Sequence, residues 1–188
     1  LDFGVMRDRV KKVVSDVTGG INFLMKKNKI EVFQGHGSFK DANTVIVKGS
    51  SETVEIKGAK IVIATGSKPS TLPGVTIDKE RVITSTEALV LKELPKKLIV
   101  IGGGVIGLEL SSVYRRLGSE VTVVEYADSI IATMDGGLGK ELHKVLKRDG
   151  IEFLLGHGVT EVKSTGKKVT VKAKNKAEYG DVVTNLNN

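Results

Sequence analysis

Three glycines and a glutamate stand at a spacing that suits the binding of a dinucleotide. Gly102, Gly104 and Gly107 form the pattern G-x-G-x-x-G, and Glu125 follows 18 residues after the last of them. The first glycine allows a tight turn, the second lets the backbone approach a pyrophosphate, and the third lets a helix pack closely on a sheet. A carboxylate at position 125 can accept hydrogen bonds from a ribose 2′-hydroxyl. These residues therefore predict a dinucleotide site, with a purely structural glycine turn as the alternative.

The residues around the glycines predict the strand, helix and strand that such a site requires. Residues 97–101 are a short apolar run, residues 105–117 have helical periodicity, and residues 121–124 are a second apolar run closed by Glu125. The predicted helix would present free N–H groups and the positive end of its dipole to the phosphates.

The residues after Glu125 favour NAD over NADP as the ligand. A 2′-phosphate would be repelled by the Glu125 carboxylate, and NADP sites place an arginine nearby. The three following residues, Tyr126, Ala127 and Asp128, include no arginine.

The composition limits the classes of function that are open to the chain. Its 188 residues, 40% of them hydrophobic, suffice for one or two domains with a buried core. The absence of cysteine excludes disulfides, thiolate metal sites and redox CxxC chemistry within this stretch. The net charge of +7 is carried by short, scattered groups of lysine and arginine, and aromatic residues make up only 4%. A lysine-rich surface is therefore favoured over nucleic-acid binding, and no apolar run is long enough to span a membrane. The three histidines show no metal-ligand spacing, and structural roles are favoured for them: His36, His143 and His157.

Periodicity and turn residues predict the remaining elements of the chain. The first part is expected to contain a helix over residues 5–27, a strand over 30–33, a turn at 35–37, a hairpin of 44–48 with 53–57, and a strand over 60–64. After a connector over residues 68–92, with Ser85 as the cap of a short helix, the second part should contain a helix over 138–148, a strand over 151–155, a hairpin of 159–163 with 169–173, and a last strand from 181 to 184.

An internal repeat links the two parts. The pattern Ile-Glu-x-x-x-Gly-His-Gly begins at Ile30 and again at Ile151, an offset of 121 residues. At the same offset, the run starting at Lys60 is aligned with the run starting at Asp181. Because a glycine fingerprint precedes only the second copy, and the sequence begins at Leu1 without a methionine, we interpret the chain as a central piece of a longer protein whose first fingerprint precedes Leu1.

The chain resembles the flavin-dependent pyridine nucleotide–disulfide oxidoreductases in four stretches: GGGVIGLELSSVYRRLGSEVTVVE, IVIATGS, STLPG and MDGGLGKELHKVLKRDGIEF. The resemblance runs from about Val10 to Val183 and is greatest to the branch that oxidises dihydrolipoamide. It implies an α/β fold of two Rossmann-like FAD/NAD(P)-binding domains with β-meander insertions, the first of them incomplete. It assigns residues 1–67 to the C-terminal part of an FAD-binding domain, 68–95 to a connector and 96–188 to an NAD-binding domain.

The resemblance also implies which residues contact the two cofactors. Near FAD it places Gly37, Ala64, Thr65, Gly66 and Ser67. Around NAD it places Gly102, Gly103, Gly104, Val105, Ile106, Gly107, Glu109, Glu125 and Val159. Independently, a glycine such as Gly37 after a strand edge lets backbone approach a ligand. Glu109 is expected in the first turn of its helix, where the dipole favours a carboxylate.

The same resemblance implies the reaction and the partners of the whole protein. Electrons would pass from protein-bound dihydrolipoamide through a disulfide and FAD to NAD⁺. The cysteine pair and a His–Glu pair of this branch are expected before Leu1 and after Asn188, so no catalytic residue and no metal ligand is assigned. A homodimer that serves 2-oxoacid dehydrogenase complexes through their lipoyl domains is expected, in the cytoplasm or, in a eukaryote, the mitochondrial matrix, with no nucleic-acid or membrane partner.

Two alternatives remain open at this point. The chain could come from a related flavoprotein without a lipoyl role, such as an NADH oxidase or a ferredoxin reductase. It could also be a non-catalytic NAD-binding module. One feature departs from the family pattern: after the last predicted strand, Thr184 to Asn188 replace the usual small residue followed by Gly-Arg-x-Pro.

Overall fold

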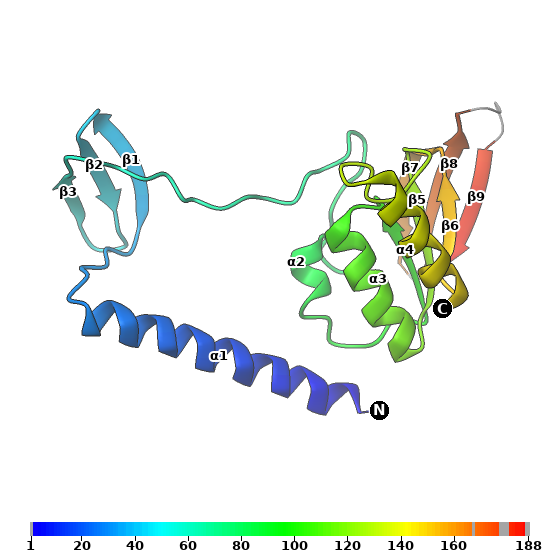
Figure 1. The fold of residues 1–188 in the computed structure, drawn as a ribbon, viewed down its shortest axis with the longest axis horizontal. Coiled ribbons are helices and arrows are strands. Elements are labelled where there is room, and N and C mark those ends of the chain that lie inside the picture. Colours follow the sequence, from blue (N-terminus) through cyan, green and yellow to red (C-terminus); the bar gives the residue numbers. More distant parts are fainter. Residues whose placement is uncertain (1, 167, 177–180, 187–188) are drawn as a thin grey trace. The chain divides into compact units, whose positions relative to one another are not determined.

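The computed structural model describes residues 2–166, 168–176 and 181–186 (Figure 1). The chain divides into two compact units between Lys68 and Pro69; the first four residues are grouped with the second unit. The first unit, Val5–Lys68, holds most of one long helix and a three-stranded sheet. The second unit holds a parallel sheet, its helices and another three-stranded sheet.

Helix α1 (Phe3–Lys27) confirms the helix predicted for residues 5–27. Gly19 and Gly20 do not interrupt it, since a glycine in a helix interior costs only about 1 kcal/mol relative to alanine. None of its residues is buried. Its apolar side chains follow the predicted spacing of three and four but remain exposed: Val10, Val13, Val14, Val17, Ile21 and Leu24.

Strands β1 (His36–Asp41), β2 (Thr44–Lys48) and β3 (Thr53–Lys57) form an antiparallel meander in the first unit. The pairing of Thr44 with Lys57 through to Lys48 with Thr53 confirms the predicted hairpin. The predicted turn at residues 35–37 is wrong, because His36 and Gly37 pair with Lys48 and Val47. A Cβ on Gly35 would lie 2.5 Å from the Lys48 carbonyl oxygen, so this glycine allows a close approach of two chain segments.

Two predicted strands of the first unit are absent. Residues 30–33 and 60–64 have no regular secondary structure. Val62 and Ile63 are 86% and 71% exposed. An apolar run forms a stable strand only when a neighbouring strand takes up its backbone hydrogen bonds, and neither run is paired with a strand among the described residues.

The second unit is built on a parallel sheet with the order β4 (Lys97–Ile101), β5 (Glu120–Glu125) and β6 (Glu152–Leu155). Helix α3 (Val105–Leu117) connects β4 to β5, and α4 (Gly136–Arg148) precedes β6. Parallel neighbours require crossovers of this kind. The predicted α/β class is thus confirmed, and the boundaries of β4 and α3 agree with the prediction from sequence.

A second meander follows the parallel sheet. Strands β7 (His157–Thr165), β8 (Lys168–Asn175) and β9 (Asp181–Leu186) pair in that order, all antiparallel. The predicted turn at Gly156-His157-Gly158 is only partly correct: Gly156 is in a turn with φ +68°, whereas His157 and Gly158 pair with Asn175 and Lys174.

The position of β9 corrects the alignment of the repeat. It pairs with β8 as β3 pairs with β2, so Asp181–Leu186 corresponds to Thr53–Lys57 and not to the run that starts at Lys60. The constant offset fails because β7 and β8 are longer than β1 and β2.

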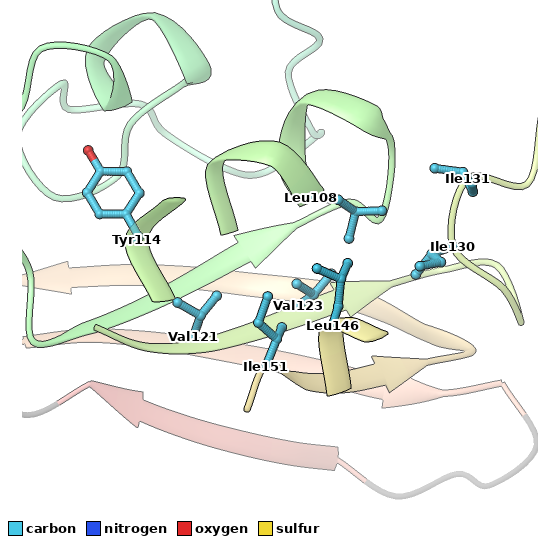
Figure 2. Close-up of a cluster of buried hydrophobic side chains, with 8 residues drawn as sticks. All are labelled: Leu108, Tyr114, Val121, Val123, Ile130, Ile131, Leu146 and Ile151. Atoms are coloured by element: carbon cyan, nitrogen blue, oxygen red, sulfur yellow. The ribbon is translucent and has the colours of Figure 1, made fainter. Parts of the chain in front are cut away.

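The hydrophobic core lies between the parallel sheet and its helices (Figure 2). It contains one group of buried side chains: Leu108, Tyr114, Val121, Val123, Ile130, Ile131, Leu146 and Ile151. The polar ends of this region are also bonded: the Tyr114 hydroxyl donates to the Ala88 carbonyl at 2.5 Å, and the Ser119 hydroxyl donates to the Pro95 carbonyl at 2.6 Å.

A short helix, α2 (Ser85–Ala88), precedes the sheet. Its cap is Thr84 and not Ser85, because the Thr84 hydroxyl accepts from the Thr86 N–H while the Glu87 carboxylate accepts from the Thr84 N–H at 2.9 Å. The reciprocal pair is a capping box.

Leu146→Ala should destabilise the second unit by about 3 kcal/mol, because it leaves a cavity between α4 and the sheet. Leu138→Ala on the same helix should cost far less, since Leu146 is 5% exposed and Leu138 is 61% exposed. Urea unfolding can be followed by tyrosine fluorescence: the chain has no tryptophan, and its three tyrosines, Tyr114, Tyr126 and Tyr179, all follow Pro69. Equal losses in the two variants would contradict the assigned core.

Candidate functional site

The glycine turn between β4 and α3 has the conformations expected from the motif. Gly102 has φ +108°, a region that residues with a side chain rarely adopt, and its N–H donates to the Val124 carbonyl at 2.8 Å. A Cβ on Gly107 would lie 2.6 Å from the Gly102 carbonyl oxygen and 3.2 Å from Val100 Cγ1. Glycine at these two positions lets the chain reverse and lets α3 lie against β4.

The N-terminus of α3 is open to an anion. Gly104 is the N-cap, no side chain caps this end, and a Cβ on Gly104 would meet no atom within 4 Å. The N–H groups of the first turn, at Val105, Ile106 and Gly107, cannot be satisfied within the helix. Val105 and Ile106 are exposed beside them. Free N–H groups, the helix dipole and open space at Gly104 together form a site for phosphate.

The Glu125 carboxylate is held against the glycine turn. Its Oε2 accepts from the Gly103 N–H at 2.5 Å, and its Oε1 accepts from the Ala127 N–H at 2.6 Å. A Cβ on Gly103 would lie 3.1 Å from Ile130 Cγ2 and 3.2 Å from Glu125 Cγ. The close approach of Glu125 thus favours glycine at position 103, a role that the sequence did not indicate. Each carboxylate oxygen keeps a lone pair for another donor.

The second meander packs against the loop that leaves β5. The Gly156 N–H donates to the Ala127 carbonyl, and the Lys176 N–H donates to the Gly156 carbonyl, both at 2.9 Å. The Lys176 ammonium lies 4.1 Å from the centre of the Tyr126 ring. Sequence reasoning gave no role to Lys176 or Tyr126, and no signal in the sequence connects residues 50 positions apart.

Val159 lies in β7, half-buried, and pairs with Ala173. It follows Gly158, whose added Cβ would contact the Tyr126 ring at 3.3 Å. The meander therefore brings this predicted residue to the same side of the unit as the loop after β5.

Glu109 does not occupy the position predicted for it. It is the fifth residue of α3 and exposed, and the first turn holds no acidic residue. The expected gain from the helix dipole falls off beyond the first turn, so that part of the argument is wrong.

The residues assigned to FAD all lie in the first unit. Gly37 lies in β1, whereas Ala64, Thr65, Gly66 and Ser67 are in an exposed segment without regular structure. The hydrogen bonds described for this unit do not join the two.

The described contacts of His143 and His157 are structural. His157 Nδ1 lies 2.7 Å from the Leu155 carbonyl oxygen, and the His143 ring contacts the Phe153 ring edge-on at 4.6 Å. No group of three or more metal-binding side chains is found among the described residues. In the same part of the chain, no helix has the length and apolar character needed to cross a membrane.

Comparison with known proteins identifies the family. The family model described as pyridine nucleotide-disulphide oxidoreductase matches residues 3–184. The chain belongs to this family. It is 51% identical over 175 residues to the mitochondrial dihydrolipoyl dehydrogenase of Dictyostelium discoideum, covering 91% of this chain and 36% of that protein. It is 46% identical over 168 residues to the leghemoglobin reductase of Vigna unguiculata, covering 88% of this chain and 32% of that protein.

A solved structure agrees with the assignment. LpdA from Mycobacterium tuberculosis matches with a TM-score of 0.85 at 25% identity, covering 97% of this chain and 41% of that one. The predicted resemblance to the pyridine nucleotide-disulphide oxidoreductases, and to their dihydrolipoyl dehydrogenases, is confirmed. The chain spans about a third of the length of the curated relatives it matches.

The glycine turn of this family member fits the polar parts of NAD. The N-terminus of α3 offers N–H donors for a pyrophosphate, and Glu125 at the carboxyl end of β5 offers acceptors for a ribose. Ligands of open α/β sheets bind at this end of the strands.

Glu125→Ala should loosen the glycine turn even without a nucleotide. Loss of a hydrogen bond to a charged group costs about 1.5–3 kcal/mol, so the Gly103 and Ala127 amides should exchange with solvent at least about tenfold faster. Glu125→Gln, which keeps one oxygen, should expose only one of the two amides. Amide exchange measured by NMR gives both rates. Glu141→Gln, at an exposed pair with Lys144 on α4, is the control and should leave both unchanged.

Proposed function

We propose that residues 96–188 form the NAD-binding part of a flavoprotein that oxidises protein-bound dihydrolipoamide. The observation that carries the nucleotide assignment is the Gly102–Gly107 turn opening α3, with the Glu125 carboxylate bonded to its Gly103 amide. Family membership and relatives named dihydrolipoyl dehydrogenase support the reaction.

Within this proposal, the residues of the chain bind and orient the nucleotide. The amides of Val105, Ile106 and Gly107 hold the pyrophosphate, and Gly104 gives it access to the backbone. Glu125 holds the ribose, and Val159 lies beside the adenosine. NAD bound there supplies a hydride acceptor. In the whole protein, electrons reach NAD⁺ from dihydrolipoamide through a disulfide and FAD.

The remaining assignments are proposals for the whole protein. Residues 1–67 contribute to the FAD-binding domain and residues 68–95 connect it to the NAD-binding domain, with Gly37, Ala64, Thr65, Gly66 and Ser67 near the flavin. The partners are a second subunit and the lipoyl domains of 2-oxoacid dehydrogenase complexes. The compartment is the mitochondrial matrix in a eukaryote, which the name of the Dictyostelium relative supports, and the cytoplasm in a bacterium.

A related NADH-dependent flavoprotein is the second candidate. The similarity to a protein named leghemoglobin reductase supports it, since that name states a different electron acceptor. Glu109 is retained as a residue of the nucleotide site in either case, through its position one turn into α3 and without the dipole argument.

The 188-residue chain should bind NADH more tightly than NADPH. Repulsion between the Glu125 carboxylate and a 2′-phosphate is expected to separate the two dissociation constants by about tenfold or more. Titration calorimetry measures both. Glu125→Ala should narrow the ratio, whereas Glu120→Ala, at the opposite end of the same strand, should not. Tighter binding of NADPH by the unchanged chain would refute the assignment of Glu125.

The purified chain should retain much less than one flavin per molecule and should not oxidise dihydrolipoamide. In the proposed assignment, residues 1–67 supply only part of the FAD-binding domain, and the chain has no cysteine for thiol–disulfide exchange. Visible absorbance and a dihydrolipoamide assay test the two statements. Stoichiometric flavin would contradict the first and any turnover the second.

A further inference from the structure

A lysine lies over the residue that follows Glu125. The Lys176 Nζ atom is 4.1 Å from the centre of the Tyr126 ring and 3.9 Å from Asp128 Oδ1. Its side chain is 35% exposed, and its ammonium lies over the ring. An ammonium over an aromatic face is attracted by the negative face of the ring, so this position is favoured.

Backbone hydrogen bonds tie the lysine to the ribose carboxylate. The Lys176 N–H donates to the Gly156 carbonyl, and the Gly156 N–H donates to the Ala127 carbonyl. The Ala127 N–H in turn donates to Glu125 Oε1 at 2.6 Å. Three successive hydrogen bonds therefore connect Lys176, directly after β8, to the carboxylate at the end of β5.

We propose that Lys176 is a second determinant of nucleotide specificity. Its ammonium can bind the 2′-phosphate of a phosphorylated adenosine. In the unchanged chain, repulsion of that phosphate by the Glu125 carboxylate outweighs this attraction. The inference deepens the proposed NAD site and rests on it. It also changes the argument from sequence, in which the absence of arginine after Glu125 implied that no cation was near. The meander supplies one from a residue remote in sequence.

The negative charges around the lysine account for a preference for NAD in its presence. Glu125 lies where a 2′-phosphate would be placed, and Asp128 is the acidic partner of the ammonium. Asp128 is 89% exposed, so its ion pair with Lys176 is weak and can exchange for a phosphate. Removing the charge of Glu125 should therefore release an attraction that is already built into the loop.

The test uses the 188-residue chain with 2′,5′-adenosine diphosphate as the probe and 5′-AMP as its match without the 2′-phosphate. Titration calorimetry should show that Glu125→Gln binds 2′,5′-adenosine diphosphate more tightly than the unchanged chain. Adding Lys176→Gln to Glu125→Gln should weaken binding of this probe by about tenfold, the effect of one charge pair near a surface, with a smaller effect on 5′-AMP.

Two further variants separate a specific contact from a general change of charge or of fold. Lys97→Gln added to Glu125→Gln removes a positive charge at the start of β4, the opposite end of the sheet, and should leave the probe affinity unchanged. Lys176→Arg added to Glu125→Gln keeps the positive charge and should preserve the tighter binding of 2′,5′-adenosine diphosphate. Asp128→Asn added to Glu125→Gln should increase the affinity for 2′,5′-adenosine diphosphate further.

The outcomes are distinguishable. Equal effects of Lys176→Gln and Lys97→Gln, or equal weakening of both probes by Lys176→Gln, would overturn the role of Lys176 while leaving the NAD site intact. If the unchanged chain binds neither NADH nor 5′-AMP, the proposed function is overturned, and this inference with it.

Discussion

The bond between the Glu125 carboxylate and the Gly103 amide is the constraint on which the proposed nucleotide site depends. One carboxylate at the end of β5 holds the turn that leaves β4 and, through Ala127, the loop that leads away from β5. Two backbone donors on one half-buried carboxylate form charge-assisted bonds, which are shorter and stronger than neutral ones. The contact favours a glycine at position 103, because a Cβ there would lie 3.1 Å from Ile130 Cγ2 and 3.2 Å from Glu125 Cγ.

The packing of α3 follows from the same few residues. Gly102 reverses the chain at a positive φ, and Gly107 lets the helix approach the Gly102 carbonyl. Leu108 and Tyr114 can then reach the core beside Val121 and Val123 (Figure 2). This arrangement leaves open space at Gly104. The contacts that stabilise the fold therefore also leave the N-terminus of α3 accessible.

Sequence reasoning succeeded where the signals are local and agree with one another. In β4, α3 and β5, the apolar runs, the glycines and the acidic residue all indicate one arrangement, and the core confirms it. It failed at residues 30–33 and 60–64, where an apolar run predicts a strand but a strand also depends on a partner elsewhere in the chain. It also misaligned β9, because hairpins of different length in the two meanders break a constant offset. The domain boundaries and the cofactor contacts remain predictions.

Lys176 shows that the charges near Glu125 cannot be inferred only from the residues that follow it in sequence. The segment Tyr126, Ala127 and Asp128 suggests a loop without cations, but the β7–β8 hairpin returns its end to that loop. In the proposed site, a ribose at Glu125 would meet the combined field of two carboxylates and one ammonium from separate parts of the chain. A preference between NAD and NADP set by such a sum depends on which charge lies nearest to the 2′ position. The Glu125 carboxylate is fixed by two backbone amides, whereas the Lys176 ammonium also interacts with an aromatic ring and an exposed aspartate. The repulsion of a 2′-phosphate by Glu125 is therefore expected to exceed its attraction by Lys176.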